Sequence, residues 1–207
     1  NSPSTFFTVG SQTMAAGCSA ESGAILIRRD SASEHWKYDI QNTGTTWKNT
    51  SFADSGWLVG GGIFGTEGNL TIRTPISNTN RSMFFRKNFS ICDPSLVTAL
   101  TLNALFDDGL VVYINGTQVY IEGVTGNPPA WDSNPTSHEA TSYEAKDLAT
   151  LIGLPALKSL LVAGNNVLAI GVYNQASSSD IVWDGELVVG SSTVTALGNG
   201  TDPGNTS

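Results

Sequence analysis

Residues 106–121, with the sequence FDDGLVVYINGTQVYI, decide the fold class of this chain. Two short runs of β-branched and aromatic residues, LVVY at 110–113 and QVYI at 118–121, flank the dipeptide Asn115-Gly116. Asn-Gly between two such runs is the strongest short-range signal for a β-hairpin, because both residues tolerate the positive φ angles of a tight turn. The stretch therefore predicts two antiparallel strands near the middle of the chain.

Further stretches on both sides of this hairpin carry strand patterns, with turn-forming residues between them. They are residues 24–29, 81–89, 96–105, 166–173 and 181–189. A weak helical pattern covers residues 144–161, and Pro155 interrupts it. Many short strands with one brief helix predict an all-β fold, an antiparallel β-sandwich of the jelly-roll type.

The chain divides into three parts by composition. Residues 1–22 form an N-terminal extension that contains a candidate strand, and residues 23–190 form the jelly-roll domain. Residues 191–207 are rich in Ser, Thr, Gly and Asn, a composition typical of a flexible tail.

The overall charge excludes some classes of partner. The formal net charge is −8, and only 14% of the 207 residues are charged. Nucleic-acid binding requires clustered Lys and Arg, so it is not expected here. No apolar run is long enough to span a membrane. The chain begins at Asn1 without an initiator Met, and we expect a mature secreted protein, extracellular or on a cell surface.

Five motifs, in the same order, resemble those of galactose-binding-like jelly-roll domains, a carbohydrate-binding-module-like fold of secreted microbial proteins. They are WKY at 36–38 with Trp47 and FADSGW at 52–57, FFRKNF at 84–89, FDDG at 106–109 with YING at 113–116, GNNVLA at 164–169, and SSD at 178–180 with WDGEL at 183–187. The resemblance implies an accessory fold without catalytic activity, associated with carbohydrate binding or a structural role. It also implies that Trp36, Trp47, Trp57 and Trp183 belong to the core or its strands.

The residues themselves contain no convincing catalytic set. Both histidines, His35 and His138, lie in polar, turn-like contexts typical of surface positions, and no GxSxG motif accompanies them. Adjacent Asp107 and Asp108 would point in different directions on an extended strand, which makes them a poor acid and nucleophile pair. We therefore expect that this protein is not an enzyme.

Two features suggest ligand sites. Asp107 and Asp108 precede the central hairpin, where two carboxylates on a tight turn supply the hard oxygen ligands that calcium prefers. This pair also resembles the Asp-Asp pair of PA14-like lectin domains, in which calcium bridges protein and sugar. The alternative is that both side chains only accept hydrogen bonds from backbone amides of the turn. Trp131 lies in the proline-rich loop 123–142 and either stacks on a glycan or packs against its own sandwich.

Covalent features point to an extracellular environment. Cys18 and Cys92 are the two cysteines, and a structural disulfide between them is preferred over two separate buried thiols. Seven N-x-[ST] sequons exceed the number expected by chance and predict a glycoprotein. The sequon at Asn88 lies within a strand and is discounted, which leaves as candidates Asn49, Asn69, Asn80, Asn115, Asn199 and Asn205.

The N-terminal extension suggests a mode of assembly. Residues 4–12, STFFTVGSQ, are a strand-forming run in which the residues singled out are Thr5, Phe6, Phe7, Thr8 and Val9. Such a strand either packs on its own sandwich or adds to an open sheet edge of another copy, as a donor strand. Donation that never closes on itself builds an open fibril, so we expect a subunit of an extracellular filament that is its own partner. The alternative is a carbohydrate-binding module that binds glycans with the help of calcium.

Overall fold

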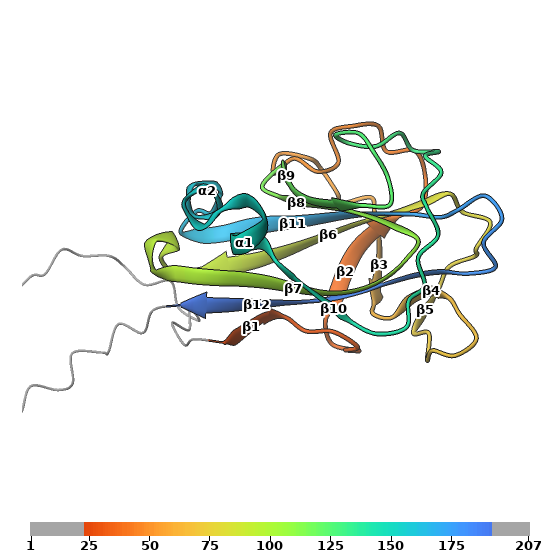
Figure 1. Cartoon of the computed structure of the whole chain (residues 1–207), viewed down its shortest axis with the longest axis horizontal. Helices are drawn as coiled ribbons and strands as arrows, with labels where there is room; N and C mark the ends of the chain where they lie inside the picture. The colour runs from red at the N-terminus through yellow and green to blue at the C-terminus, as the bar shows by residue number, and fades with distance from the viewer. Residues whose placement is uncertain (1–22, 192–207) are drawn as a thin grey trace, which may run out of the picture.

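The computed structural model describes residues 23–191, which form two six-stranded sheets packed face to face (Figure 1). The first sheet has the order β10-β7-β12-β4-β5, and β1 also pairs with β12. The second sheet has the order β3-β2-β6-β11-β8-β9. All pairings are antiparallel except that of β4 with β5, so the predicted antiparallel β-sandwich is confirmed.

The strands of the first sheet are β1 (Ala24–Ile27), β4 (Phe64–Thr66), β5 (Thr74–Pro75), β7 (Val97–Asp107), β10 (Glu144–Asp147) and β12 (Ile181–Ser191). Those of the second sheet are β2 (His35–Asp39), β3 (Leu58–Gly61), β6 (Ser82–Ile91), β8 (Gly109–Ile114), β9 (Thr117–Glu122) and β11 (Gly164–Tyr173). A single 3-10 turn, η1 (Pro94–Leu96), joins β6 to β7 within this part of the chain.

The central hairpin is the predicted one. Strands β8 and β9 pair from Leu110↔Glu122 to Ile114↔Thr117. Asn115 and Gly116 form the turn with φ angles of 50° and 87°, the left-handed values that this dipeptide tolerates.

Three clusters of hydrophobic side chains stabilise the sandwich, and the third and smallest contains Ile63, Leu105 and Val182. The main core lies between the sheets and contains Trp36 and Trp183. A second cluster lies on the outer face of the second sheet and contains Trp47 and Trp57, which come from the loop between β2 and β3. All four tryptophans are buried, as their motif positions predicted.

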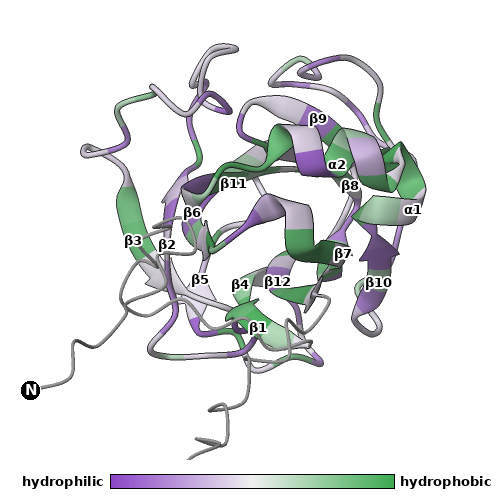
Figure 2. Ribbon diagram, turned by 90° about the vertical axis from the view of Figure 1, so that its left-hand side faces the viewer, coloured by the Kyte–Doolittle hydropathy of each residue, from purple (hydrophilic) through white to green (hydrophobic). Residues whose placement is uncertain are grey.

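The segment expected to be helical is a short strand followed by two short helices. Residues 144–147 form β10, which pairs with β7, and α1 (Leu148–Ile152) and α2 (Leu154–Leu160) follow. Asp147 caps α1 by accepting hydrogen bonds from the backbone N–H groups of Ala149 and Thr150. Helix α1 contacts β7, β9 and β10, so the helices cover one side of the sandwich where the two sheets meet (Figure 2). Neither helix of residues 23–191 has the length and hydropathy to cross a membrane.

Arg86 fastens the loop between β2 and β3 to the outer face of the second sheet. Its side chain is 4% exposed, and its Nε donates to Asp54 Oδ2 at 2.8 Å. Its Nη1 donates to the backbone oxygens of Trp47 and Asn49. The guanidinium therefore satisfies three acceptors of one loop, a geometry that the compact ammonium of lysine does not reproduce.

We predict that Arg86→Lys lowers the free energy of unfolding by about 2 kcal/mol, because a planar, multidentate hydrogen-bond donor is lost from a buried position. Urea denaturation monitored by tryptophan fluorescence measures the change. The matched control is Arg28→Lys at an exposed position, which should change stability by less than about 0.5 kcal/mol. Equal stability of the Arg86→Lys variant and the control would show that Arg86 does not anchor the loop.

Candidate functional site

On the side of the sandwich opposite the helices, β1 and the end of β6 lie near each other, and each has an edge that no strand of residues 23–191 pairs with. On one side, β6 pairs along its whole length with β11, from Ser82↔Tyr173 to Ile91↔Gly164. On its other side only residues 84–86 pair, with β2, and within residues 23–191 no strand pairs with residues 87–91. Strand β1 pairs with β12 on one side alone. We call the space between β1 and residues 87–91 of β6 the open seam.

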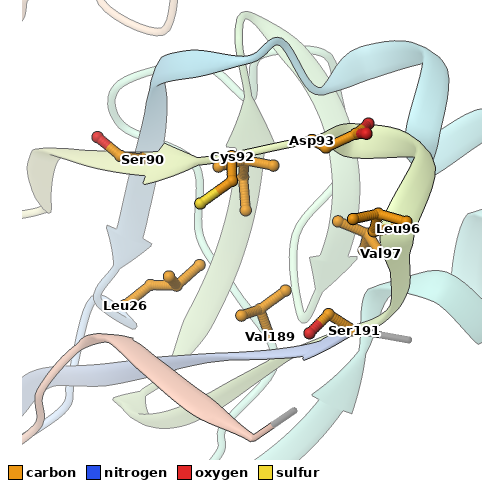
Figure 3. A pocket seen from close by; sticks show the side chains of 9 residues that line it. Leu26, Ser90, Cys92, Asp93, Leu96, Val97, Val189 and Ser191 are labelled. Carbon is orange, nitrogen blue, oxygen red and sulfur yellow. The ribbon is translucent and has the colours of Figure 1, made fainter. Parts of the chain in front are cut away.

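An apolar pocket lies at one end of the open seam (Figure 3). Its walls come from both sheets and from the connection between β6 and β7, and its lining residues are Leu26, Ser90, Ile91, Cys92, Asp93, Leu96, Val97, Val189 and Ser191. Figure 3 shows Leu26 and Val189 on one side of the pocket and Cys92 and Val97 across from them. The open seam therefore exposes side chains that adjoin the main hydrophobic core.

A bulge in β1 gives the pocket part of its apolar wall. The register of β1 against β12 shifts between Ile25 and Ile27, which leaves Leu26 as the extra residue. A bulge redirects side chains relative to regular alternation. Ile27 is consequently buried in the main core, while the adjacent Leu26 packs against the same core and lines the pocket. Ile25 remains 42% exposed.

The other end of the open seam is polar. Lys87 Nζ lies 2.6 Å from Glu34 Oε1 and donates to the backbone oxygen of His35 at 2.7 Å. Both charged side chains are largely buried, with exposures of 18% and 23%. This ion pair lies where the pairing of β2 with β6 ends, and the apolar pocket lies at the other end of residues 87–91, next to Ser90 and Ile91.

Of the residues that the sequence predicted to take part in the disulfide and the assembly, only Cys92 lies among the described residues. Cys92 lines the pocket. Its expected disulfide partner, Cys18, lies outside the described residues, as do the candidate donor residues Thr5, Phe6, Phe7, Thr8 and Val9. The disulfide and the donor strand therefore stay predictions.

The structure assigns different surroundings to Asp107 and Asp108. Asp108 accepts hydrogen bonds from the backbone N–H groups of His138, at 3.1 Å, and Gln175, at 2.8 Å, which is the turn-amide role. Asp107 is 1% exposed, and its Oδ1 has no hydrogen-bond partner within residues 23–191. Burial, and then repulsion by Asp108, raises the pKa of Asp107 to about 8. The two carboxylates therefore have different surroundings, and a calcium site that uses both of them stays a prediction.

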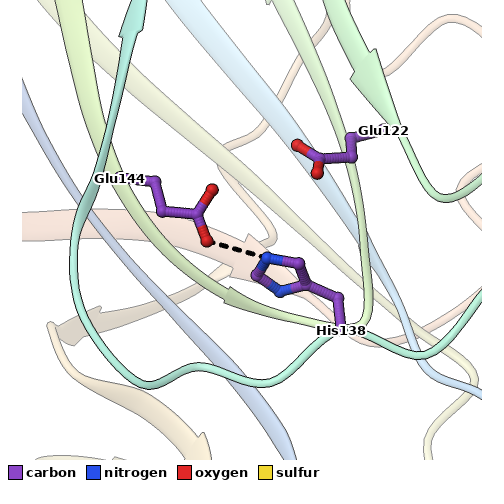
Figure 4. Close-up of side chains that lie close together, drawn as sticks. All are labelled: Glu122, His138 and Glu144. Atoms are coloured by element: carbon purple, nitrogen blue, oxygen red, sulfur yellow. Dashed lines mark hydrogen bonds and ion pairs between the residues drawn. The ribbon is translucent and has the colours of Figure 1, made fainter.

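A polar cluster that the sequence did not predict surrounds His138 (Figure 4). The His138 ring stacks on Phe106, with 4.1 Å between the ring centroids, and its Nε2 lies 2.8 Å from Glu144 Oε1. Glu122 completes the group. His138 is therefore a partly buried loop anchor, in contrast to the surface position expected for it, whereas His35 is exposed.

The side chain of Lys146 forms ion pairs with both glutamates of this cluster. Its Nζ lies 2.8 Å from both Glu122 Oε2 and Glu144 Oε2. Burial alone would raise the pKa of each glutamate, but hydrogen bonds from Lys146 hold both below their ordinary values. The ammonium thus provides the positive charge that a metal ion would otherwise supply.

Trp131 packs mainly against its own sandwich. It is half-buried, contacts the second hydrophobic cluster, and its backbone oxygen accepts a hydrogen bond from Ser82. It also borders a surface hollow whose other lining residues include Asn42, Thr45 and Pro128. A role in glycan binding stays a prediction.

The predicted glycosylation sites differ in their surroundings. Asn69 is exposed, and Asn49 and Asn80 are partly buried. The Nδ2 of Asn115 donates to the backbone oxygen of Leu160 at 2.9 Å and to Asn166 Oδ1 at 2.8 Å. A glycan on Nδ2 replaces one of its two hydrogens and would break at least one of these bonds, which disfavours this site. Asn199 and Asn205 lie outside the described residues.

Comparison with known proteins yields structural likeness alone. No family model matches the chain, and no curated protein matches it. A β-glucuronidase of glycoside hydrolase family 2 matches 76% of the chain with 15% identity and a TM-score of 0.46. A glycosyl hydrolase family 2 member from Bacteroides cellulosilyticus matches 79% with 12% identity and a TM-score of 0.44, and a β-glucuronidase from Ruminococcus gnavus matches 80% with 10% identity and a TM-score of 0.42. The matches cover 14%, 21% and 29% of those proteins, respectively.

We predict that Lys146→Met lowers the free energy of unfolding by about 1–2 kcal/mol, because it leaves Glu122 and Glu144 close together without their shared cation. Chemical denaturation at neutral pH measures the change. The same substitution at Lys37, which forms none of these ion pairs, is the control. A smaller loss for Lys146→Met than for Lys37→Met would contradict the role assigned to Lys146.

Proposed function

We propose that this protein is a non-catalytic, secreted structural subunit that assembles into an extracellular filament by strand donation between copies. The observation that supports this most is the open seam, where a free edge of β6 adjoins an apolar pocket. Free edges are normally covered, twisted away or charged, because they pair readily with other strands. Here an edge that no strand of residues 23–191 pairs with lies beside a small apolar pocket at the margin of the core, a combination that suits an added strand.

The open seam offers both kinds of contact that strand addition uses. Among the described residues, no strand pairs with the backbone donors and acceptors of residues 87–91 on the side away from β11. The partly buried Leu26, with the buried Val97 and Val189 behind it, gives the adjoining pocket its apolar lining. In strand addition the backbone bonds supply affinity and the pockets supply specificity.

The N-terminal residues of a second copy have a suitable composition to fill the open seam. Residues 1–20 contain no Asp, Glu, Lys or Arg. In an extended strand Thr5, Phe7 and Val9 lie on one face, with Phe6 and Thr8 on the other, so Phe7 and Val9 would face the seam together. Fully extended, the 17 residues before Cys18 reach about 60 Å, which is enough to cross to a neighbouring copy.

Such donation is head-to-tail, because the donor and acceptor are different parts of the same chain. An interface of this kind propagates unless its rotation closes a ring, so the expected assembly is a filament. Donation into the chain's own seam would instead produce a monomer, and the experiment below distinguishes the two.

We predict that the full chain forms filaments, whereas a variant without residues 1–12 remains a folded monomer with an open acceptor site. Negative-stain electron microscopy and size-exclusion chromatography measure assembly, and far-ultraviolet circular dichroism measures folding. The matched control lacks residues 196–207, a deletion of equal length at the other terminus, and should assemble like the full chain.

A peptide of residues 1–12 provides the complementary test of the acceptor. Added to the shortened monomer, it should raise the melting temperature by several degrees, since it binds the folded state alone. A peptide with Phe7→Asp and Val9→Asp should have no effect. Filaments formed without residues 1–12, or a full chain that is monomeric at every concentration, would refute the proposal.

Carbohydrate binding is the second candidate, favoured by the hollow beside Trp131. Aromatic rings that border a hollow can stack on sugar rings. A glycan array, probed with and without calcium, is the test, with Trp131→Ala as the variant. Binding that disappears in Trp131→Ala but survives in Trp131→Phe would support this function over a purely structural role.

A further inference from the structure

Asp107 belongs to a second acidic cluster, distinct from the one around His138. One carboxylate oxygen from each of Asp107, Glu139 and Asp180 lies within 4.8 Å of the others. The three residues come from different segments: Asp107 ends β7, Glu139 lies in the loop before β10, and Asp180 directly precedes β12. The sequence analysis singled out Asp107 and its neighbour Asp108, but it did not connect Asp107 with the other two carboxylates.

Asp108 is the residue that brings these segments together. One carboxylate oxygen accepts from the N–H of His138, which directly precedes Glu139. The other accepts from the N–H of Gln175, in the turn that leads to Asp180. Ser178 Oγ fixes that turn further by donating to Asp180 Oδ1 at 2.8 Å. Asp108 therefore positions two loops, and its neighbour Asp107 meets the carboxylates that these loops carry.

The contrast with the His138 cluster shows what this cluster lacks. There, Lys146 lies 2.8 Å from two glutamates. In the described part of the chain, no Lys or Arg forms an ion pair with Asp107, Glu139 or Asp180. Asp107 is also 1% exposed, with its Oδ1 buried and without a hydrogen-bond partner among those residues. A buried carboxylate in this position requires either a proton or a cation.

We propose that Asp107, Glu139 and Asp180 bind a calcium ion that links the end of β7 to the two loops beside it. Three carboxylates offer hard oxygen ligands and no nitrogen or sulfur, a donor set that suits calcium and not zinc. Glu139 is exposed, so the ion can enter from solvent and keep water molecules in its coordination shell. The site is independent of the open seam and does not rest on the proposed assembly.

Thermal unfolding of the full chain in EDTA and in about 1 mM calcium chloride tests the site, a concentration that fills even weak extracellular calcium sites. Calcium should raise the melting temperature by several degrees, since a ligand of the folded state stabilises it. Isothermal titration calorimetry should give one calcium ion per chain. Asp107→Asn, Glu139→Gln and Asp180→Asn should each abolish both signals.

Glu144→Gln is the matched control, because Glu144 already has Lys146 as its partner, and this variant should retain the full calcium effect. Glu139 is exposed, so Glu139→Gln keeps the fold intact and makes its loss of calcium response interpretable. Identical melting temperatures in EDTA and calcium would overturn the proposal, as would a full calcium response in Glu139→Gln and Asp180→Asn. An increase in melting temperature for Asp107→Asn without any calcium response would show that Asp107 is simply protonated.

Discussion

The mismatch in length between β6 and its neighbour β2 is the constraint from which the open seam follows. β6 is ten residues long, but β2 pairs with three of them, and β1 reaches the same side of the sandwich from the other sheet without pairing with β6. On the opposite side, α1 packs across the boundary between the sheets. One side of the sandwich is therefore covered by the helices. Within residues 23–191, the other side combines a backbone edge that no strand pairs with and an apolar pocket, and the proposed strand donation rests on this asymmetry.

Local sequence signals predicted the regular parts of the fold well. Asn115-Gly116 identified its hairpin because positive φ angles are a property of the dipeptide itself. A helix was predicted over 144–161, but residues 144–147 form the strand β10. Their pairing with β7, which is distant in sequence, overrides the local helical propensity. The strand pattern also missed β2, β3, β4 and β5. The last three have four residues or fewer, rich in glycine and threonine, and give no periodicity to detect.

The candidate sites were harder to predict because they join residues distant in sequence. Asp107 and Asp108 are adjacent, yet one accepts hydrogen bonds from two loop amides and the other faces Glu139 and Asp180. Neighbouring carboxylates repel each other unless a positive charge lies between them, and the two acidic clusters differ in this respect. Lys146 neutralises one of them, whereas no lysine or arginine of the described chain pairs with the other. Sequence composition shows the acidic residues, but only the fold shows which of them lie close together.

The central claim is that the open seam receives a strand from another copy, and site-specific photocrosslinking tests it most directly. A photoreactive phenylalanine analogue replaces Phe7, chains with light and heavy isotopes are mixed before assembly, and mass spectrometry identifies the crosslinked residues. The account predicts crosslinks between light and heavy chains at residues that line the seam, such as Leu26 and Ile91. Crosslinks confined to a single chain, or located away from the seam, would contradict it.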